Sequence, residues 1–218
     1  MGFEIQTYGE ANADTLLIQM VDDHGLEVIE NEVALIRELS GGQRFCLKTV
    51  KVRSWNHDLS PWTAPAVFGN EDFGDGAAES LRFLKDAVLP RPSDNHEKSL
   101  GKIYIGGYSL AGLFALWTGY QTDCFDGIAA VSPSIWFPDF TKYMMENRIR
   151  ADAVYLSLGD REERTKNPVM SQVGDEIRNA ESILKEERKE CILEWNKGNH
   201  FKNPDLRTAK GFAWLMNR

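Results

Sequence analysis

The sequence has few cysteines, which limits the sites it can build. Its three cysteines, Cys46, Cys124 and Cys191, are scattered along the chain and lack the spacing of a metal or redox site. An odd number of isolated thiols is typical of a reduced, cytosolic protein. The histidines likewise show no metal-ligand spacing, so we expect no metal site.

Long hydrophobic runs and an excess of positive charge are also missing. No apolar run approaches the length of a membrane span, and the first ten residues lack the basic and apolar regions of a secretion signal. We therefore expect a cytoplasmic protein without a membrane partner. Because 33 acidic residues outnumber 25 basic ones, giving a net charge of −8, nucleic acids and anionic membranes are unfavourable partners.

The chain shows no internal repeat, low-complexity segment or linker, so we expect residues 1–218 to form a single domain. Apolar periodicity predicts strands at 3–8, 16–21, 45–52, 103–105, 125–132, 153–158 and 191–195. It predicts helices at 26–39, 77–88, 110–117, 138–149, 170–188 and 206–216. This alternation indicates an α/β fold with a mostly parallel sheet and helices on both faces, in which ligands bind at the carboxyl ends of the strands.

Two predicted surface features complete this outline. The helix at 26–39 has an apolar face, with its acidic residues expected on the opposite, solvent face, and Ser40-Gly41-Gly42 ends it. The polar stretch 93–100, which contains His96, is expected to be a surface loop.

One motif carries chemistry. Gly107-Tyr108-Ser109-Leu110-Ala111 lies between a short buried strand and a long apolar helix, and it approaches the Gly-x-Ser-x-Gly pattern of a nucleophile elbow. There a sharp turn exposes the serine hydroxyl, and its neighbours must be small because strand and helix backbones nearly touch. The alternative interpretation is a glycine-rich turn with an ordinary serine.

An acid and a histidine follow Ser109 in the order used by α/β-hydrolases. Each comes directly after a predicted strand, the acid within Gly159-Asp160-Arg161-Glu162-Glu163 and the histidine as His200. In this arrangement Ser109 attacks an acyl carbon, His200 accepts its proton, and a carboxylate orients the imidazole. Glu162 is the preferred acid, Asp160 the second choice and Glu163 the third.

The rest of the predicted site comes from loops. The backbone N–H of Leu110 should be one oxyanion donor, and the second should come from Trp55 or its neighbour Asn56. We expect Tyr108, His57 and Trp136 to contact the substrate. Aromatic residues gather in the loops expected near Ser109, either as a stacking pocket or as packing against the sheet edge: Trp55, Trp62, Phe68, Phe73, Trp136, Phe137 and Phe201.

The serine motif, the loop 55–65, Val131-Ser-Pro-Ser-Ile-Trp136 and Gly198-Asn-His-Phe201 occur together. On these residues, the sequence resembles the esterase family of α/β-hydrolases that includes esterase D-like, enterobactin-type siderophore and feruloyl esterases. The resemblance implies an α/β-hydrolase fold without a large lid. It also implies a carboxylesterase that needs no cofactor and acts on a small-molecule ester.

The same resemblance implies specific residue roles. Ser109 is the nucleophile, His200 the general base, and Glu162 the acid of a catalytic triad. Some siderophore esterases of the family use only serine and histidine, so the contribution of the acid stays open. The Asp-Gln-Gly run typical of S-formylglutathione hydrolases is missing, because Leu156-Ser-Leu-Gly159 stands in its place.

The sequence is also compatible with two other functions. An acyltransferase or thioesterase would use the same Ser109 and His200 with a different acceptor. A non-catalytic binding protein could also be built on a hydrolase scaffold, because fold does not dictate function. The sequence leaves the oligomeric state, including a homodimer, undetermined.

Overall fold

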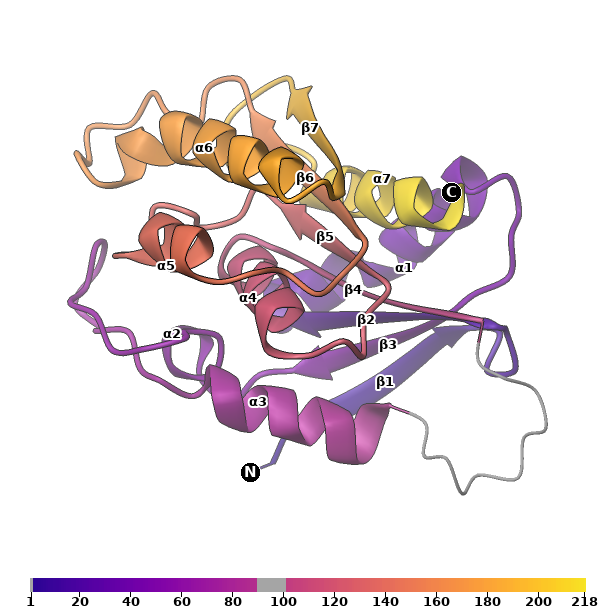
Figure 1. Ribbon diagram of the computed structural model, residues 1–218. Helices are drawn as coiled ribbons and strands as arrows, with labels where there is room; N and C mark the ends of the chain where they lie inside the picture. Colours follow the sequence, from indigo (N-terminus) through magenta and orange to yellow (C-terminus); the bar gives the residue numbers. More distant parts are fainter. Residues whose placement is uncertain (1, 90–100) are drawn as a thin grey trace.

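The computed structural model describes residues 2–89 and 101–218, and their strands form one seven-stranded sheet (Figure 1). The strand order is β1-β3-β2-β4-β5-β6-β7. β1 runs antiparallel to β3, whereas all other neighbours are parallel, which confirms the predicted mostly parallel sheet. The strands are β1 (Glu4–Gly9), β2 (Thr15–Val21), β3 (Cys46–Lys51), β4 (Lys102–Tyr108), β5 (Gly127–Val131), β6 (Ala153–Gly159) and β7 (Glu190–Asn196).

Helices cover both faces of the sheet. Two of them, α1 (Asp23–Leu39) and α7 (Pro204–Met216), pack together on one face (Figure 1). The opposite face is covered by α3 (Ala77–Phe83), α4 (Leu110–Gln121), α5 (Phe140–Glu146) and α6 (Val173–Glu186). Shorter elements are α2 (Trp55–Asp58), the π-helical turn η1 (Leu84–Val88) and the 3-10 turn η2 (Met170–Gln172).

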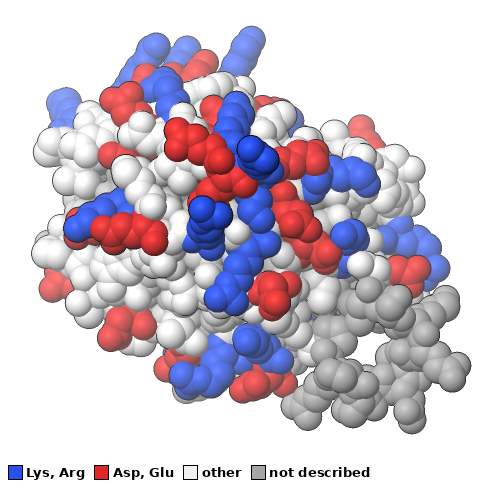
Figure 2. Space-filling model, viewed as in Figure 1, with Lys and Arg blue, Asp and Glu red and all other residues white. Residues whose placement is uncertain are grey.

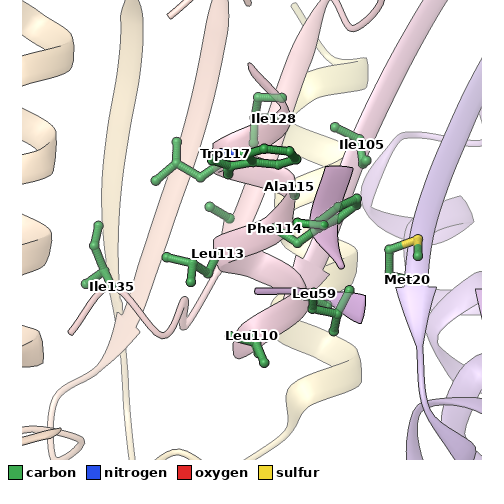
Figure 3. Close-up of a cluster of buried hydrophobic side chains, with 14 of the residues drawn as sticks. Met20, Leu59, Ile105, Leu110, Leu113, Phe114, Ala115, Trp117, Ile128 and Ile135 are labelled. Carbon is green, nitrogen blue, oxygen red and sulfur yellow. The ribbon is translucent and has the colours of Figure 1, made fainter. Parts of the chain in front are cut away.

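Alternation along the strands divides the core into two layers. In β2, Leu16 and Ile18 join the core beneath α4, whereas Leu17 joins the core beneath α1 and α7. Successive side chains of a strand point to opposite faces, so one apolar strand supplies both layers. The central helix α4 is buried along nearly its whole length, and Figure 3 shows Phe114 and Trp117 among the side chains of this core. This packing fixes the start of α4, where Ser109 lies.

The surface is charged in both signs. Figure 2 shows lysines and arginines interspersed with aspartates and glutamates on the face it presents. On α6, for example, Lys185 pairs with Glu181 at 2.6 Å. No helix within residues 2–89 and 101–218 is long and apolar enough to cross a membrane; the apolar α4 has only 12 residues.

Several predicted helix limits were wrong. α1 begins at Asp23 rather than residue 26, because the Asp22 side chain accepts a hydrogen bond from Gly25 N at 2.8 Å and caps the helix. The helix predicted at 138–149 spans only Phe140–Glu146, because the left-handed backbone of Asp139 delays its start and the extended backbone of Asn147 ends it. The predicted loop 93–100 with His96 lies outside the described residues.

The expectation that the acids of α1 face solvent needs one correction. Glu32 is buried, with 2% of its surface exposed, and it lies against Gln19 of β2. The other acids of the helix are not among the buried residues. Glu32 therefore belongs to the interface between α1 and the sheet, close to the edge where Ser109 lies.

Candidate active site

Ser109 occupies a strained turn between β4 and α4. Its backbone has φ 60° and ψ −123°, a conformation that non-glycine residues rarely adopt. Glycines on either side allow this close turn: a Cβ on Gly107 would lie 2.7 Å from the Ala111 carbonyl carbon, and one on Gly112 would lie 2.8 Å from the Gly107 oxygen. The strand and helix backbones thus approach closely, as a nucleophile elbow requires.

Three predicted side chains from separate loops are joined by hydrogen bonds. His200 Nε2 lies 3.0 Å from Ser109 Oγ, and His200 Nδ1 lies 2.7 Å from Glu162 Oε2. Ser109 follows β4, Glu162 follows β6 and His200 follows β7, so all three lie at the carboxyl edge of the parallel sheet. The sheet therefore brings together residues that are up to 91 positions apart.

The surroundings of Glu162 keep it ionised. Burial would raise its pKa, but hydrogen bonds from His200, Gly159 and Ser132, together with the charge of His200, outweigh burial and lower the pKa below its ordinary value. An ionised carboxylate can only accept hydrogen bonds. His200 Nδ1 therefore carries the proton, which leaves Nε2 free to accept the hydroxyl proton of Ser109.

The other two candidate acids lie elsewhere. Asp160 Oδ1 accepts a hydrogen bond from Gly198 N at 2.8 Å, so it holds the backbone of the loop 197–203, called here the histidine loop. Glu163 faces Arg178 of α6, with 3.7 Å between the charged atoms. Of the three predicted acids, Glu162 is the one that contacts His200.

Arg207 of α7 holds the side chain of Glu162, a role that no sequence motif indicates. It is 2% exposed, and its Nη1 donates to Glu162 Oε1 at 2.8 Å. Its Nη2 donates to the carbonyls of Lys197 and Asn199 at 3.3 and 3.1 Å. One guanidinium thus fixes both the acid and the histidine loop, as its planar set of five donors allows.

Tyr108 acts on the same loop from the other side. Its hydroxyl donates to the backbone oxygen of His200 at 2.7 Å and accepts from Arg207 Nη1 at 3.0 Å. Burial, followed by the charge of Glu162, raises the pKa of Tyr108 to about 12, so the hydroxyl keeps its proton. The Tyr108 hydroxyl is therefore used to position His200, although the residue also lines the cavity described below.

No family model and no curated protein matches the sequence, but solved structures do. An IroE-like serine hydrolase from Shewanella oneidensis superposes with a TM-score of 0.78, covering 98% of this chain and 75% of that one at 14% identity. The siderophore hydrolase EstA from Aspergillus nidulans gives 0.72, covering 99% and 90% at 20% identity. The chain has the α/β-hydrolase fold.

Another match to the α/β-hydrolase fold is the enterobactin esterase FES from Shigella flexneri. It superposes with a TM-score of 0.64, covering 97% of this chain and 54% of the esterase at 14% identity. These solved structures are of hydrolases and esterases, the family that the sequence resembles. Sequence identities this low support the predicted fold and do not transfer a substrate.

The α/β-hydrolase fold encloses a cavity of about 690 Å³ beside Ser109 and His200. Four of the predicted aromatic residues line it, namely Trp55, Phe68, Trp136 and Phe201. The other three pack together, with Phe73 and Phe137 buried and Trp62 partly buried: the rings of Trp62 and Phe137 lie 5.7 Å apart and those of Phe73 and Phe137 lie 5.1 Å apart. The aromatic cluster is thus divided between pocket and core.

His57 is not among the residues that line the cavity, and its contact with a substrate stays a prediction. Its Nδ1 lies 3.1 Å from Asp58 Oδ1. The chain at Gly74 and Gly76 covers its ring, so that a Cβ at either glycine would lie 2.5 Å from a ring atom. His57 therefore lies against the loop after β3, with 48% of its side chain exposed.

Two backbone N–H groups, one next to Ser109 and one on a residue that lines the cavity, are available as donors. Leu110 and Trp55 are the first residues of α4 and α2, and the structure gives their N–H groups no acceptor within the described part of the chain. Trp55 lines the cavity, whereas Asn56 makes its contacts with the loop at Glu71 and Gly74. Of the two residues considered for the second donor, Trp55 has the better location.

Two serines after β5 complete the surroundings of Ser109, and sequence reasoning assigned neither a role. Ser134 Oγ lies 3.3 Å from Ser109 Oγ, and Ser132 Oγ donates to Glu162 Oε1 at 2.8 Å. Both belong to the run Val131–Trp136 that contributes to the family resemblance. Among residues 2–89 and 101–218, no group of three His, Cys, Asp or Glu side chains is arranged to hold a metal ion.

Proposed function

We propose that the protein hydrolyses carboxylic esters through an acyl-enzyme formed on Ser109. The observation that carries the proposal is the hydrogen-bonded series Ser109–His200–Glu162, with distances of 3.0 and 2.7 Å, built on a strained elbow. A serine hydroxyl is a weak nucleophile until an adjacent base accepts its proton. The strained backbone at Ser109 lowers the stability of the folded protein, so stability does not account for this arrangement and a catalytic role does.

Acylation begins when Ser109 Oγ attacks the ester carbonyl carbon. His200 Nε2 accepts the hydroxyl proton, and the resulting imidazolium is stabilised by Glu162. The tetrahedral intermediate then collapses, its carbon–oxygen bond to the alcohol breaks, and His200 returns the proton to the departing alkoxide. The acyl group remains on Ser109 as an ester.

Deacylation repeats these steps with water. His200 accepts a proton from water, the hydroxide attacks the acyl carbon, and the bond to Ser109 breaks as His200 protonates its oxygen. The N–H groups of Leu110 and Trp55 would donate to the oxyanion in both halves. Donors at such a position contribute roughly 10²–10³-fold to kcat.

The first experiment is hydrolysis of p-nitrophenyl acetate and butyrate by wild type and Ser109→Ala. We expect turnover by wild type and a loss of roughly 10⁴–10⁶-fold in the variant. Circular dichroism checks that the variant is folded. Equal rates for the folded variant and wild type would overturn the proposal.

A fluorophosphonate probe provides a second test that does not depend on the choice of ester. We expect it to label Ser109 in wild type and to label His200→Ala far more slowly, because the base is gone. Absence of labelling in folded wild type would instead indicate a binding protein on a hydrolase scaffold. Partition of the acyl-enzyme toward an added alcohol or thiol would indicate an acyltransferase.

A further inference from the structure

Carboxylates dominate the charge of the cavity. Besides Glu162, which forms an ion pair with Arg207, four acidic residues line it: Asp22, Glu27, Glu32 and Asp205. None of the lysines or arginines in the described part of the chain lines it. With Gln19, these four acids form the part of the cavity next to the first turns of α1 and α7, called here the acidic arm.

Two side chains of the acidic arm are buried and incompletely hydrogen-bonded. Gln19 is 4% exposed and Glu32 2%. Gln19 Nε2 donates to Glu32 Oε2 over 3.4 Å, and the Oε1 atoms of both residues have no partner. A buried polar atom without a partner costs about 1–3 kcal/mol.

When Glu32 is ionised, both unpartnered oxygens are hydrogen-bond acceptors, and a ligand that completes them must donate to both. A primary ammonium carries three N–H donors and no acceptor. We propose that the acidic arm binds the ammonium group of an ester substrate, with Gln19 and Glu32 accepting its hydrogen bonds and Asp205 adding negative charge. This substrate assignment rests on the proposed function of Ser109.

The electrostatics of Glu32 agree with an absent cationic partner. Burial, and to a smaller extent the charge of Asp205, raise the pKa of Glu32 to about 8, against the lowering effect of Gln19. An ammonium would offset both unfavourable effects, because an opposite charge favours the ionised carboxylate. Asp205 has one neutral partner, since its Oδ2 accepts from Asn31 Nδ2 at 2.6 Å.

Several other residues that line the cavity are apolar. Trp55, Phe68, Trp136 and Met170 line it, which suits an uncharged or aromatic group. The cavity as a whole therefore matches an ester that carries both an apolar part and a protonated amine.

Binding to Ser109→Ala tests the proposal without requiring hydrolysis. Calorimetry would compare two isosteric pairs, in which an ammonium replaces a terminal methyl group. Methyl 6-aminohexanoate and methyl heptanoate examine the acyl side, and 6-aminohexyl acetate and heptyl acetate examine the alcohol side. In one pair we expect the ammonium ester to bind at least about tenfold more tightly, which corresponds to about 1.4 kcal/mol.

Variants locate the preference. Glu32→Gln keeps the shape and removes the carboxylate, so in the Ser109→Ala background it should reduce the ammonium preference to below about threefold. Asp205→Asn, on the other helix of the arm, should reduce it as well. The matched control is Glu38→Gln, an exposed acid at the far end of α1 that does not line the cavity, and it should retain the preference.

The outcomes separate this proposal from the preceding one. Equal affinities within both pairs, or a preference that survives both Glu32→Gln and Asp205→Asn, would overturn the ammonium site even if wild type hydrolyses neutral esters. Conversely, an ammonium preference lost in these variants would support the site even if wild type hydrolyses none of the p-nitrophenyl esters.

Discussion

Glu162 is held between His200 and Arg207, with one carboxylate oxygen 2.7 Å from the imidazole and the other 2.8 Å from the guanidinium. The acid therefore cannot rotate away from the histidine without leaving a buried arginine unpaired. We expect this relationship to make Arg207 a positioning residue for the proposed triad.

Arg207→Met should reduce both activity and stability. Removing one partner of a buried ion pair typically costs about 3–5 kcal/mol of unfolding free energy. Misplacement of Glu162 by about 1 Å should lower kcat about 10²-fold with little change in KM. Urea unfolding and steady-state kinetics measure the two effects. Arg82→Met, at an exposed position of α3, is the control and should change stability by less than about 0.5 kcal/mol.

Arg207→Lys separates positioning from charge. Lysine retains the charge but lacks the planar set of donors that reaches Glu162 and two carbonyls of the histidine loop. It should recover part of the lost stability and less of the lost kcat. Wild-type kcat in both variants would contradict a positioning role.

Replacing each candidate acid by its amide tests which carboxylate orients His200. Glu162→Gln should lower kcat/KM by roughly 10²–10⁴-fold, and by less than the loss of Ser109, because the amide favours the wrong imidazole tautomer. Asp160→Asn should stay within about threefold, since its amide oxygen can still accept from Gly198 N. A large loss in Asp160→Asn with none in Glu162→Gln would reverse the assignment. Small losses in both would indicate a serine–histidine dyad.

Gly112→Ala should destabilise the elbow. The new Cβ would lie 2.8 Å from the Gly107 oxygen and 3.0 Å from the Val131 oxygen, and these backbone atoms cannot move independently. We expect a loss of about 1–3 kcal/mol in urea unfolding. Gly119→Ala in the same helix is the matched control: its Cβ meets the flexible end of Ile149 at 3.1 Å, so its cost should be smaller. Equal losses of unfolding free energy in the two variants would show that the backbone around Gly112 can move apart to accommodate the new Cβ.

Glu32 should make the protein less stable as pH rises. Its pKa is about 8 in the folded protein and about 4.5 ordinarily, so between these pH values the folded state keeps a proton that the unfolded state has lost. The unfolding free energy should then fall by up to about 1.4 kcal/mol per pH unit from this group. Glu32→Gln removes this dependence.

Urea unfolding of wild type and Glu32→Gln at pH 5 and pH 8 measures the effect. We expect the variant to gain stability relative to wild type at the higher pH. The lowered pKa of Glu162 acts in the opposite direction: its contribution is present above the ordinary value and is lost as pH falls through the lowered one. Since both proteins contain Glu162, it cancels in their difference. A difference independent of pH would contradict the assignment.

The order of strands and helices could be predicted from the sequence, because apolar periodicity indicates which residues are buried and turn residues indicate where each element ends. The serine motif and the chain order of acid and histidine also located Ser109 and His200 at the sheet edge. Sequence spacing alone could not determine which of Asp160, Glu162 and Glu163 contacts His200. It depends on how the turn after β6 directs each side chain, and the structure shows Glu162 facing His200.

Residues that act through tertiary contacts were missed. Arg207 has the sequence setting of an ordinary arginine in an amphipathic helix, and its burial depends on the packing of α7 against the site. The periodicity of α1 predicts that Glu32 faces solvent. Periodicity within one helix does not show that a neighbouring strand supplies a polar partner, here Gln19. The contact partners of His57, which lies against Asp58 and the chain at Gly74 and Gly76, likewise depend on how the long loop folds.

The histidine loop is tied down at each of its first residues. Arg207 binds the carbonyls of Lys197 and Asn199, Asp160 binds the N–H of Gly198, and Tyr108 binds the carbonyl of His200. The conformational entropy of this segment is therefore lost when the protein folds and not at each turnover. The proposed general base, His200, is therefore held in position before substrate binds, and we expect the rate-limiting motion of the protein to lie outside the histidine loop.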